Sequence, residues 1–419
     1  MCKTKGGIKL EVKKRMIFLI GYSVYILTNV FIESELADLG SMGMILRLLK
    51  YMGIFLVILS CYSDTKLDIK RTEILGSLIF ISLINMIVFD GGTGIVEIAI
   101  IVGCFAMIRD SLRDIFKWSI YNLAAGHIII MLLSMIGILE DRVTTRWVGS
   151  YMGSFFGGEY IRHQMGFLAS NQIPLTLMII YIMFIAYKKE KISLKEHVIF
   201  LILNMFCFIS FGARVSFLLI IGAFFVYCIL KLSDKAFENW TIKTNFIWSL
   251  FPICMMISLI LGYFYNANSR LWLLLNDIFY NRIRWAHAGL KHYGLSILGY
   301  GLKAGQATGA NGENLVDNGY VLILLQRGII ITVMVILMWS YSTYMAEKSR
   351  DKYMVLALIL IAGASLIDNH LITYKMIPFY CTFISGKDEI KNKGKVLLDK
   401  YKFVFKYKFV IASRNVREK

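Results

Sequence analysis

Long apolar runs separated by short loops constrain this chain more than any other feature. A bilayer core needs about 20 consecutive apolar residues per helix. By that rule the sequence predicts twelve spanning helices, at residues 16–32, 43–62, 73–89, 93–108, 118–139, 168–187, 198–212, 214–231, 246–264, 319–345, 354–370 and 371–386. The chain is 57% hydrophobic and only 18% charged, which excludes an ordinary soluble domain.

Backbone groups inside these runs must hydrogen-bond to one another, and in lipid this leaves only helices or a closed β-barrel. Only three prolines occur in 419 residues, so most of the chain can continue as unbroken helix. The strict alternation of apolar and polar residues that is typical of barrel strands is absent. The predicted fold class is therefore an all-α polytopic membrane protein with about 12 transmembrane helices.

The loops between the runs are basic in alternation. The basic segments are the N-terminal residues, 64–73, 109–117, 188–197, 231–243, 347–352 and the tail from residue 387. Lysine and arginine are enriched in cytoplasmic loops, so we expect these segments and both termini in the cytoplasm. In this orientation the basic segments that give the chain its net charge of +18 lie beside the anionic cytoplasmic leaflet. The sequence contains no nucleic-acid motif. RNA binding is the alternative for the tail.

These observations predict a membrane domain at residues 1–386, beginning with an uncleaved first helix, and a basic cytoplasmic tail at residues 387–419. Two predicted outer loops are long, at about 140–167 and 265–318. Loops of that length are usually functional. Spaced leucines and isoleucines predict an interfacial helix over 271–294, and the glycine-rich residues 299–312 are typical of a segment that closes over a site.

Several arginines lie on the predicted outer side, against the usual distribution. Arginine keeps its charge and binds phosphate oxygens through a bidentate fork, which suits a lipid pyrophosphate. A carboxylate in the same layer, Asp317, can accept a proton from a hydroxyl. The outward clusters contain Arg162, Arg214, Arg282 and Arg284 with His287 and His292, Asp317 and Asn318 with Arg327, and Asp368 with His370. We find no metal-ligand spacing, so we expect no metal and no other cofactor.

Each of these side chains also has a structural interpretation, and the sequence leaves both open. The structural roles are snorkelling for Arg282 and Arg284, capping or ion pairing for Arg214, an ion pair for Arg327, helix capping for Asp317 and Asn318, solvation for His287 and His292, and loop anchoring for Arg162. Within the spans, Arg47, Lys50 and Glu97 are expected to pair or to snorkel.

The ordered clusters resemble those of bacterial Wzy-type capsule and O-antigen polymerases and of the related O-antigen ligases. The resemblance covers roughly residues 150–380. It rests on Arg162, Gly166, Phe167 and Asn171, on Phe211–Arg214 with Ser216, on Arg282–Leu290 with Gly299–Gly301, on Asp317–Tyr320 with Arg327 and Gly328, and on Asp368–His370 with Pro378 and Phe379. The chain departs from the family at Ala169 and Ser170, where His-Pro is common. Ligases carry histidine where Asp317 stands, which favours a polymerase.

The resemblance implies a fold similar to GT-C membrane glycosyltransferases, in the plasma (inner) membrane of a bacterium. It implies transfer of a growing glycan from undecaprenyl pyrophosphate onto a lipid-linked oligosaccharide repeat at the outer face. The implied partners are that lipid-linked oligosaccharide and membrane lipid, with a chain-length regulator and a flippase of the same pathway as candidates. The expected catalytic residues are Asp317, Arg214 and Arg282, and those expected to bind substrate or pyrophosphate are Arg162, Arg284, Arg327, Asn318, Tyr320 and His370.

Two other functions compete with this hypothesis. A lipid-linked oligosaccharide flippase also has about twelve spans, but a transporter would place charges near the bilayer midplane within repeated halves. The sequence has no such repeat, and its charges gather on the predicted outer side. An O-antigen ligase differs from a polymerase only in its acceptor.

Overall fold

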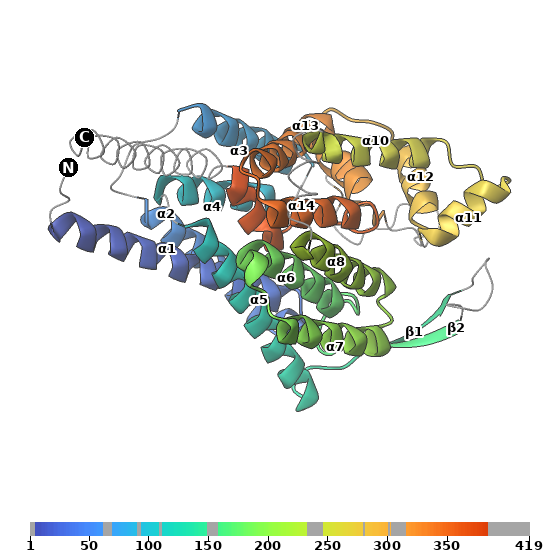
Figure 1. Ribbon diagram of the computed structural model, residues 1–419, viewed down its shortest axis with the longest axis horizontal. Coiled ribbons are helices and arrows are strands. Elements are labelled where there is room, and N and C mark those ends of the chain that lie inside the picture. Colours follow the sequence, from blue (N-terminus) through green and yellow to red (C-terminus); the bar gives the residue numbers. More distant parts are fainter. Residues whose placement is uncertain are drawn as a thin grey trace, which may run out of the picture.

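The computed structural model describes residues 5–61, 69–89, 94–108, 111–148, 158–232, 246–279, 281–300, 302 and 316–383. Over these residues the protein is a bundle of helices with one β-hairpin (Figure 1). The helices are α1 Lys5–Ile32, α2 Met42–Leu59, α3 Ile69–Phe89, α4 Gly94–Ile108, α5 Leu112–Met135, α6 Gln172–Lys188, α7 Leu194–Phe211, α8 Arg214–Leu232, α10 Leu250–Tyr263, α11 Arg270–Ile278, α12 Arg282–Tyr293, α13 Gly319–Lys348 and α14 Lys352–Ala364. Residues 377–383 are also helical.

Every predicted apolar run contains one of these helices. In the part of the chain that the structure describes, seven helices are long and apolar enough to cross a membrane. Four more apolar helices are shorter, at Gly76–Ile87, Gly94–Ile108, Ile247–Tyr263 and Lys352–Ala364. The helical membrane-protein class is therefore confirmed, whereas the number of twelve crossings stays a prediction.

The outer helices of the bundle expose apolar side chains around most of their circumference. Only 22% of the spanning window is buried in each of α2, α7 and α8. Ile209 on α7 is 72% exposed, and Phe225 on α8 is 60% exposed. A contiguous apolar surface of this kind needs cover other than water, and lipid provides it.

The loops meet at two opposite ends of the bundle. At one end, the strands β1 (Val143–Val148) and β2 (Gly158–His163) project together with α11 and α12 (Figure 1). We call this the hairpin end. At the other end, Lys189 pairs with Asp351 at 2.6 Å, and Lys352 donates to the Leu230 carbonyl at 2.6 Å. The basic segments 188–197 and 347–352 thus converge beside the end of α8.

The structure corrects two details of the predicted loops. The 140–167 segment contains an antiparallel hairpin, in which Val143 pairs with His163 and Val148 with Gly158, so the described chain is not entirely helical. The predicted interfacial helix over 271–294 is two helices, because Asn281 adopts a left-handed conformation with φ of 66° between α11 and α12. Most of residues 299–312 and the tail at 387–419 lie outside the described residues.

The long helix α13 is broken at Gly328, whose backbone is non-helical (φ 77°, ψ 179°). The segment after α12 supplies the hydrogen bonds that the break removes. The amides of Ile329 and Tyr300 bond to the Ser296 and Leu325 carbonyls, at 3.0 and 2.9 Å respectively. Irregular backbone within an apolar bundle is tolerated where the rest of the protein buries it and hydrogen-bonds to its amides and carbonyls. The 296–300 segment therefore stabilises the break.

Two glycines are required at this contact. A Cβ at Gly299 would lie 2.5 Å from the Gln326 carbonyl oxygen, and one at Gly328 would lie 2.5 Å from the Leu298 carbonyl carbon. Both residues also have positive φ, at 83° and 77°. Side chains at these positions would separate the 296–300 segment from α13.

We expect Gly328→Ala to destabilise the protein by roughly 1–3 kcal/mol from backbone strain, with a further cost from the steric overlap. The matched control is Gly363→Ala in α14, where a Cβ meets nothing within 4 Å. Because alanine favours helix more than glycine does, the control should be neutral or slightly stabilising. Thermal unfolding of the detergent-purified protein measures both variants. Equal melting temperatures would contradict the proposed close contact.

Candidate functional site

Two of the predicted arginines lie at the turn between α7 and α8. The helix α7 ends at Gly212, which is left-handed with φ of 62°, and α8 begins at Arg214. Strand β2 carries Arg162 to the same turn, where its Nε donates to the Phe211 carbonyl at 2.7 Å. Arg214 is 8% exposed. The loop-anchoring role considered for Arg162 is therefore observed, and it brings a second cation to the Arg214 turn.

The base of the hairpin is fixed by Asp141, which holds strand β2 in place. Its carboxylate accepts from the backbone amides of Gln164 at 3.0 Å and Met165 at 2.7 Å, and lies 2.6 Å from His163 Nδ1. Burial alone would raise the pKa of Asp141, but these hydrogen bonds together bring it below its usual value. The charged carboxylate thus orients the strand that carries Arg162.

Two of the expected catalytic residues, Arg282 and Asp317, come together where α12 meets the start of α13. Arg282 Nη2 lies 3.4 Å from Asp317 Oδ2, and Arg282 Nε donates to the Ile367 carbonyl at 3.1 Å. The Asp317 side chain is 31% exposed, and that of Arg282 is 12% exposed. A small pocket opens beside Arg282, lined also by Ser258, Gly262, Phe279, Asn318 and Leu366. The Arg282 guanidinium therefore borders this pocket and also pairs with the partly exposed Asp317 carboxylate.

Asn318 and Tyr320 have structural roles beside this pair. The Asn318 side chain caps α13 by accepting from the amides of Tyr320 and Val321, at 3.1 and 3.0 Å. Its amide group donates to Ser258 Oγ at 3.1 Å and to the Leu366 carbonyl at 2.8 Å. Tyr320 is fully buried, and its hydroxyl donates to the Ala362 carbonyl at 3.0 Å. The capping alternative thus holds for Asn318, and substrate contact by either residue stays a prediction.

The remaining predicted residues occupy separate positions. Arg284 is exposed on α12. Arg327 lies at the break in α13 and donates to Asn85 Oδ1 at 3.0 Å, so an amide takes the place of the acid that an ion pair would need. His287 is held by the Gly262 carbonyl at 2.8 Å and is not simply solvated. His370 is 1% exposed, in the connection between α14 and the short helix η4 (Tyr374–Met376).

Sequence reasoning missed a group of polar residues at the same end. Lys375 Nζ lies 2.9 Å from Glu33 Oε2 and donates to Gln172 Oε1 at 3.0 Å. Tyr374 donates to the same Glu33 oxygen at 2.9 Å. The sequence signal for this group is Lys375 itself, because a cation inside a predicted span, here 371–386, is a candidate functional residue. The expected pairing inside the bundle is confirmed for Lys50, which lies 2.7 Å from Glu97.

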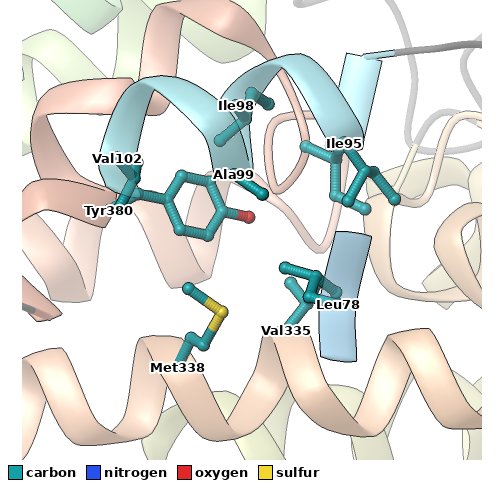
Figure 2. A pocket seen from close by; sticks show the side chains of 9 residues that line it. Leu78, Ile95, Ile98, Ala99, Val102, Val335, Met338 and Tyr380 are labelled. Atoms are coloured by element: carbon teal, nitrogen blue, oxygen red, sulfur yellow. The ribbon is translucent and has the colours of Figure 1, made fainter. Parts of the chain in front are cut away.

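A second pocket, between α3, α4, α13 and the final helix, is entirely apolar in its lining apart from one hydroxyl. Figure 2 shows Ile95 and Ile98 of α4 above it, Val335 and Met338 of α13 below it, and Leu78 and Tyr380 at its right and left. The Tyr380 hydroxyl is already bonded to the Leu371 carbonyl and to Trp339 Nε1. This pocket therefore offers packing volume and no group for chemistry.

Comparison with known proteins adds no assignment. No family model matches the chain, and no curated protein matches its sequence.

The different roles of Asp317 and Asn318 predict different effects on stability. We expect Asn318→Ala to lower the free energy of unfolding by about 1–3 kcal/mol, because it removes a helix cap and leaves buried groups unpaired. Asp317→Ala should cost less than about 1 kcal/mol, because its ion pair is long and partly exposed. Thermal unfolding of both variants in one detergent provides the comparison. A larger loss for Asp317→Ala would reverse these assignments.

Proposed function

We propose that this chain is a polysaccharide polymerase, a membrane glycosyltransferase that extends a glycan carried on undecaprenyl pyrophosphate. The observation that carries the proposal is the partly open pair of Arg282 and Asp317, with Arg162 and Arg214 at the same end of the bundle. The ordered resemblance of these segments to polymerase motifs gives the substrate class.

Three of the arginines are suited to bind the pyrophosphate of the donor, because main-chain carbonyls orient two of them and the third is exposed. Arg162 and Arg282 both donate through Nε to main-chain carbonyls, which orients each guanidinium without removing its charge. Arg284 is exposed on the helix that carries Arg282. Positive charge held in this way stabilises a pyrophosphate leaving group, because the donors are in place before charge develops.

The proposed reaction has one bond-forming and one bond-breaking step. The acceptor hydroxyl oxygen bonds to the anomeric carbon of the growing glycan, and the bond from that carbon to the pyrophosphate oxygen breaks. The Asp317 carboxylate takes the hydroxyl proton. The undecaprenyl pyrophosphate leaves with the bonding electron pair and is stabilised by Arg214 and Arg282. The chain's own arginines carry the charge in this scheme.

The proposed setting is the plasma membrane of a bacterium, with the hairpin end outside and both termini in the cytoplasm. The basic segments that meet at the opposite end support this orientation, because lysine and arginine favour the cytoplasmic side. The proposed partners are the lipid-linked repeat, membrane lipid, and a chain-length regulator and flippase of the same pathway. A GT-C-like fold with twelve crossings belongs to the same proposal.

One observation favours a flippase as the second candidate. The break in α13 places Arg327 and irregular backbone within a spanning helix, and discontinuous helices are common at transporter substrate sites. However, the Gly299–Gly328 contact fills the break with protein backbone. The open groups lie at the hairpin end instead, which is why we favour an enzyme.

Deletion of the gene separates these functions. We expect cells without it to accumulate single lipid-linked repeats on the outer face and to lose the long-chain ladder on a glycan gel. The reason is that export precedes polymerisation in the proposed reaction. Repeats retained on the cytoplasmic face would instead identify a flippase, and intact polymer not attached to its acceptor would identify a ligase.

Site variants test the chemistry in the complemented deletion strain. We expect Arg214→Ala and Asp317→Asn to reduce long-chain glycan by about 100-fold or more, the typical contribution of a general base or a charge-stabilising group. Arg270→Ala is the matched control, because Arg270 is an exposed arginine at the start of α11 at the same end. Glycan gels measure product, and immunoblots of membranes measure insertion. Normal ladders from both site variants would refute the assignment.

A further inference from the structure

The polar group centred on Lys375 is a cluster built from four separate parts of the chain. Glu33 follows α1, His127 lies in α5, Gln172 begins α6, His370 precedes η4, and Lys375 lies within η4. We call these five residues the Lys375 cluster. The Lys375 side chain is 3% exposed, whereas that of Glu33 is 29% exposed. Glu33 and Gln172, which is half-buried, therefore lie at the more open side of the cluster.

Two buried histidines of the cluster have unused hydrogen-bonding capacity. His127 is 5% exposed and His370 is 1% exposed. Among the described residues, His127 Nε2 and His370 Nδ1 have no hydrogen-bond partner. His370 lies five residues before Lys375 in the chain. His127 stacks on Phe167, and the amide of the next residue, Leu168, donates to the Glu33 carbonyl at 3.2 Å. An unpaired buried polar atom costs free energy, so two of them around one lysine indicate a partner that binds there.

The cluster carries no surplus charge. The Lys375 ammonium is balanced by the Glu33 carboxylate at 2.9 Å. Burial disfavours the charged form of an imidazole, and both histidine rings are buried. A pyrophosphate needs excess positive charge and is poorly matched here. Neutral imidazole, carboxylate, ammonium and amide groups together offer both donors and acceptors, which matches sugar hydroxyls.

The ring of His127 adds an apolar face to this arrangement. It stacks on Phe167, with 4.8 Å between the ring centroids and 21° between the planes. The backbone around Phe167 is fixed by its bridge to Ser34 and by the bond from the Glu35 amide to the Gly166 carbonyl at 2.9 Å. The stack therefore lies beside Ser34, the residue that follows Glu33. Convergent polar groups next to aromatic surface are typical of small-molecule sites.

We propose that the Lys375 cluster is a second binding site, which takes a neutral, hydroxyl-rich sugar. This sugar is the acceptor repeat of the proposed polymerase, so its identity rests on the proposed function. The connection from α14 to η4 contributes to both sites. Its Leu366 and Ile367 carbonyls bond to Asn318 and Arg282, and its His370 belongs to the cluster. A sugar held at the cluster is thus linked through this connection to the charged donor site.

The test uses two probes on the full-length protein purified in detergent. One probe is inorganic pyrophosphate. The other is the free repeat oligosaccharide, released by mild acid from the lipid-linked fraction of the source cells. We expect the double variant His127→Phe, His370→Phe to lose about tenfold in oligosaccharide affinity, as expected for one or two hydrogen bonds. Its pyrophosphate affinity should stay within about twofold of the wild type.

Phenylalanine retains the ring volume and leaves the Glu33–Lys375 pair intact. A purely structural role for the two histidines predicts an unchanged or higher melting temperature and unchanged affinity for both probes, and this result would overturn the proposal. Loss of affinity for both probes would also overturn the proposal, because the histidines would then belong to the pyrophosphate site. The reference variant Arg282→Ala should lose affinity for pyrophosphate and retain its affinity for the oligosaccharide.

The two proposals fail separately. If gene deletion leaves the glycan ladder unchanged while the oligosaccharide still binds through the histidines, the sugar site stands and the polymerase function falls. If deletion abolishes the ladder but the wild-type protein binds only pyrophosphate, the function stands and the Lys375 cluster is not the sugar site.

Discussion

Pairing of the backbone at the break in α13 is the interaction on which the arrangement of the hairpin end depends. A helix interrupted at Gly328 leaves amides and carbonyls that lipid cannot satisfy. The 296–300 segment supplies partners for them, and its close approach needs glycine on both sides. Because this segment follows α12 directly, the pairing also fixes α12 against the start of α13. Arg282 reaches Asp317 as a consequence.

The charges at this end are held in two different ways. Carbonyl oxygens orient Arg162 and Arg282 through Nε, and the partly exposed Asp317 carboxylate lies 3.4 Å from Arg282. Lys375 is instead almost fully buried, where Glu33 pairs with it at 2.9 Å and Gln172 accepts a hydrogen bond from it. One end of a single bundle therefore presents two ion pairs, and the cation of the second is the more deeply buried.

The sequence predicted the helices well because each apolar run has the length and composition of a spanning segment. It predicted that Lys50 and Glu97 pair or snorkel, because burying either charge alone is costly, and the structure shows that they pair with each other. It did not predict the hairpin, because the strand pairing depends on register and on Asp141 rather than on apolar alternation. The division of 271–294 into two helices was also missed, since it arises from one left-handed residue, Asn281. Such local conformations leave little trace in hydrophobicity.

The candidate site was only partly predictable, because residue type alone does not separate support from chemistry. Asp317 and Asn318 are adjacent and both precede a helix, yet only Asn318 turns its side chain onto the helix amides. Asp317 is thereby left partly exposed beside Arg282. Asn318 also donates to the Leu366 carbonyl, in the connection that carries His370 of the Lys375 cluster. One structural asparagine thus contacts both the helix start beside Asp317 and the connection that leads to the Lys375 cluster.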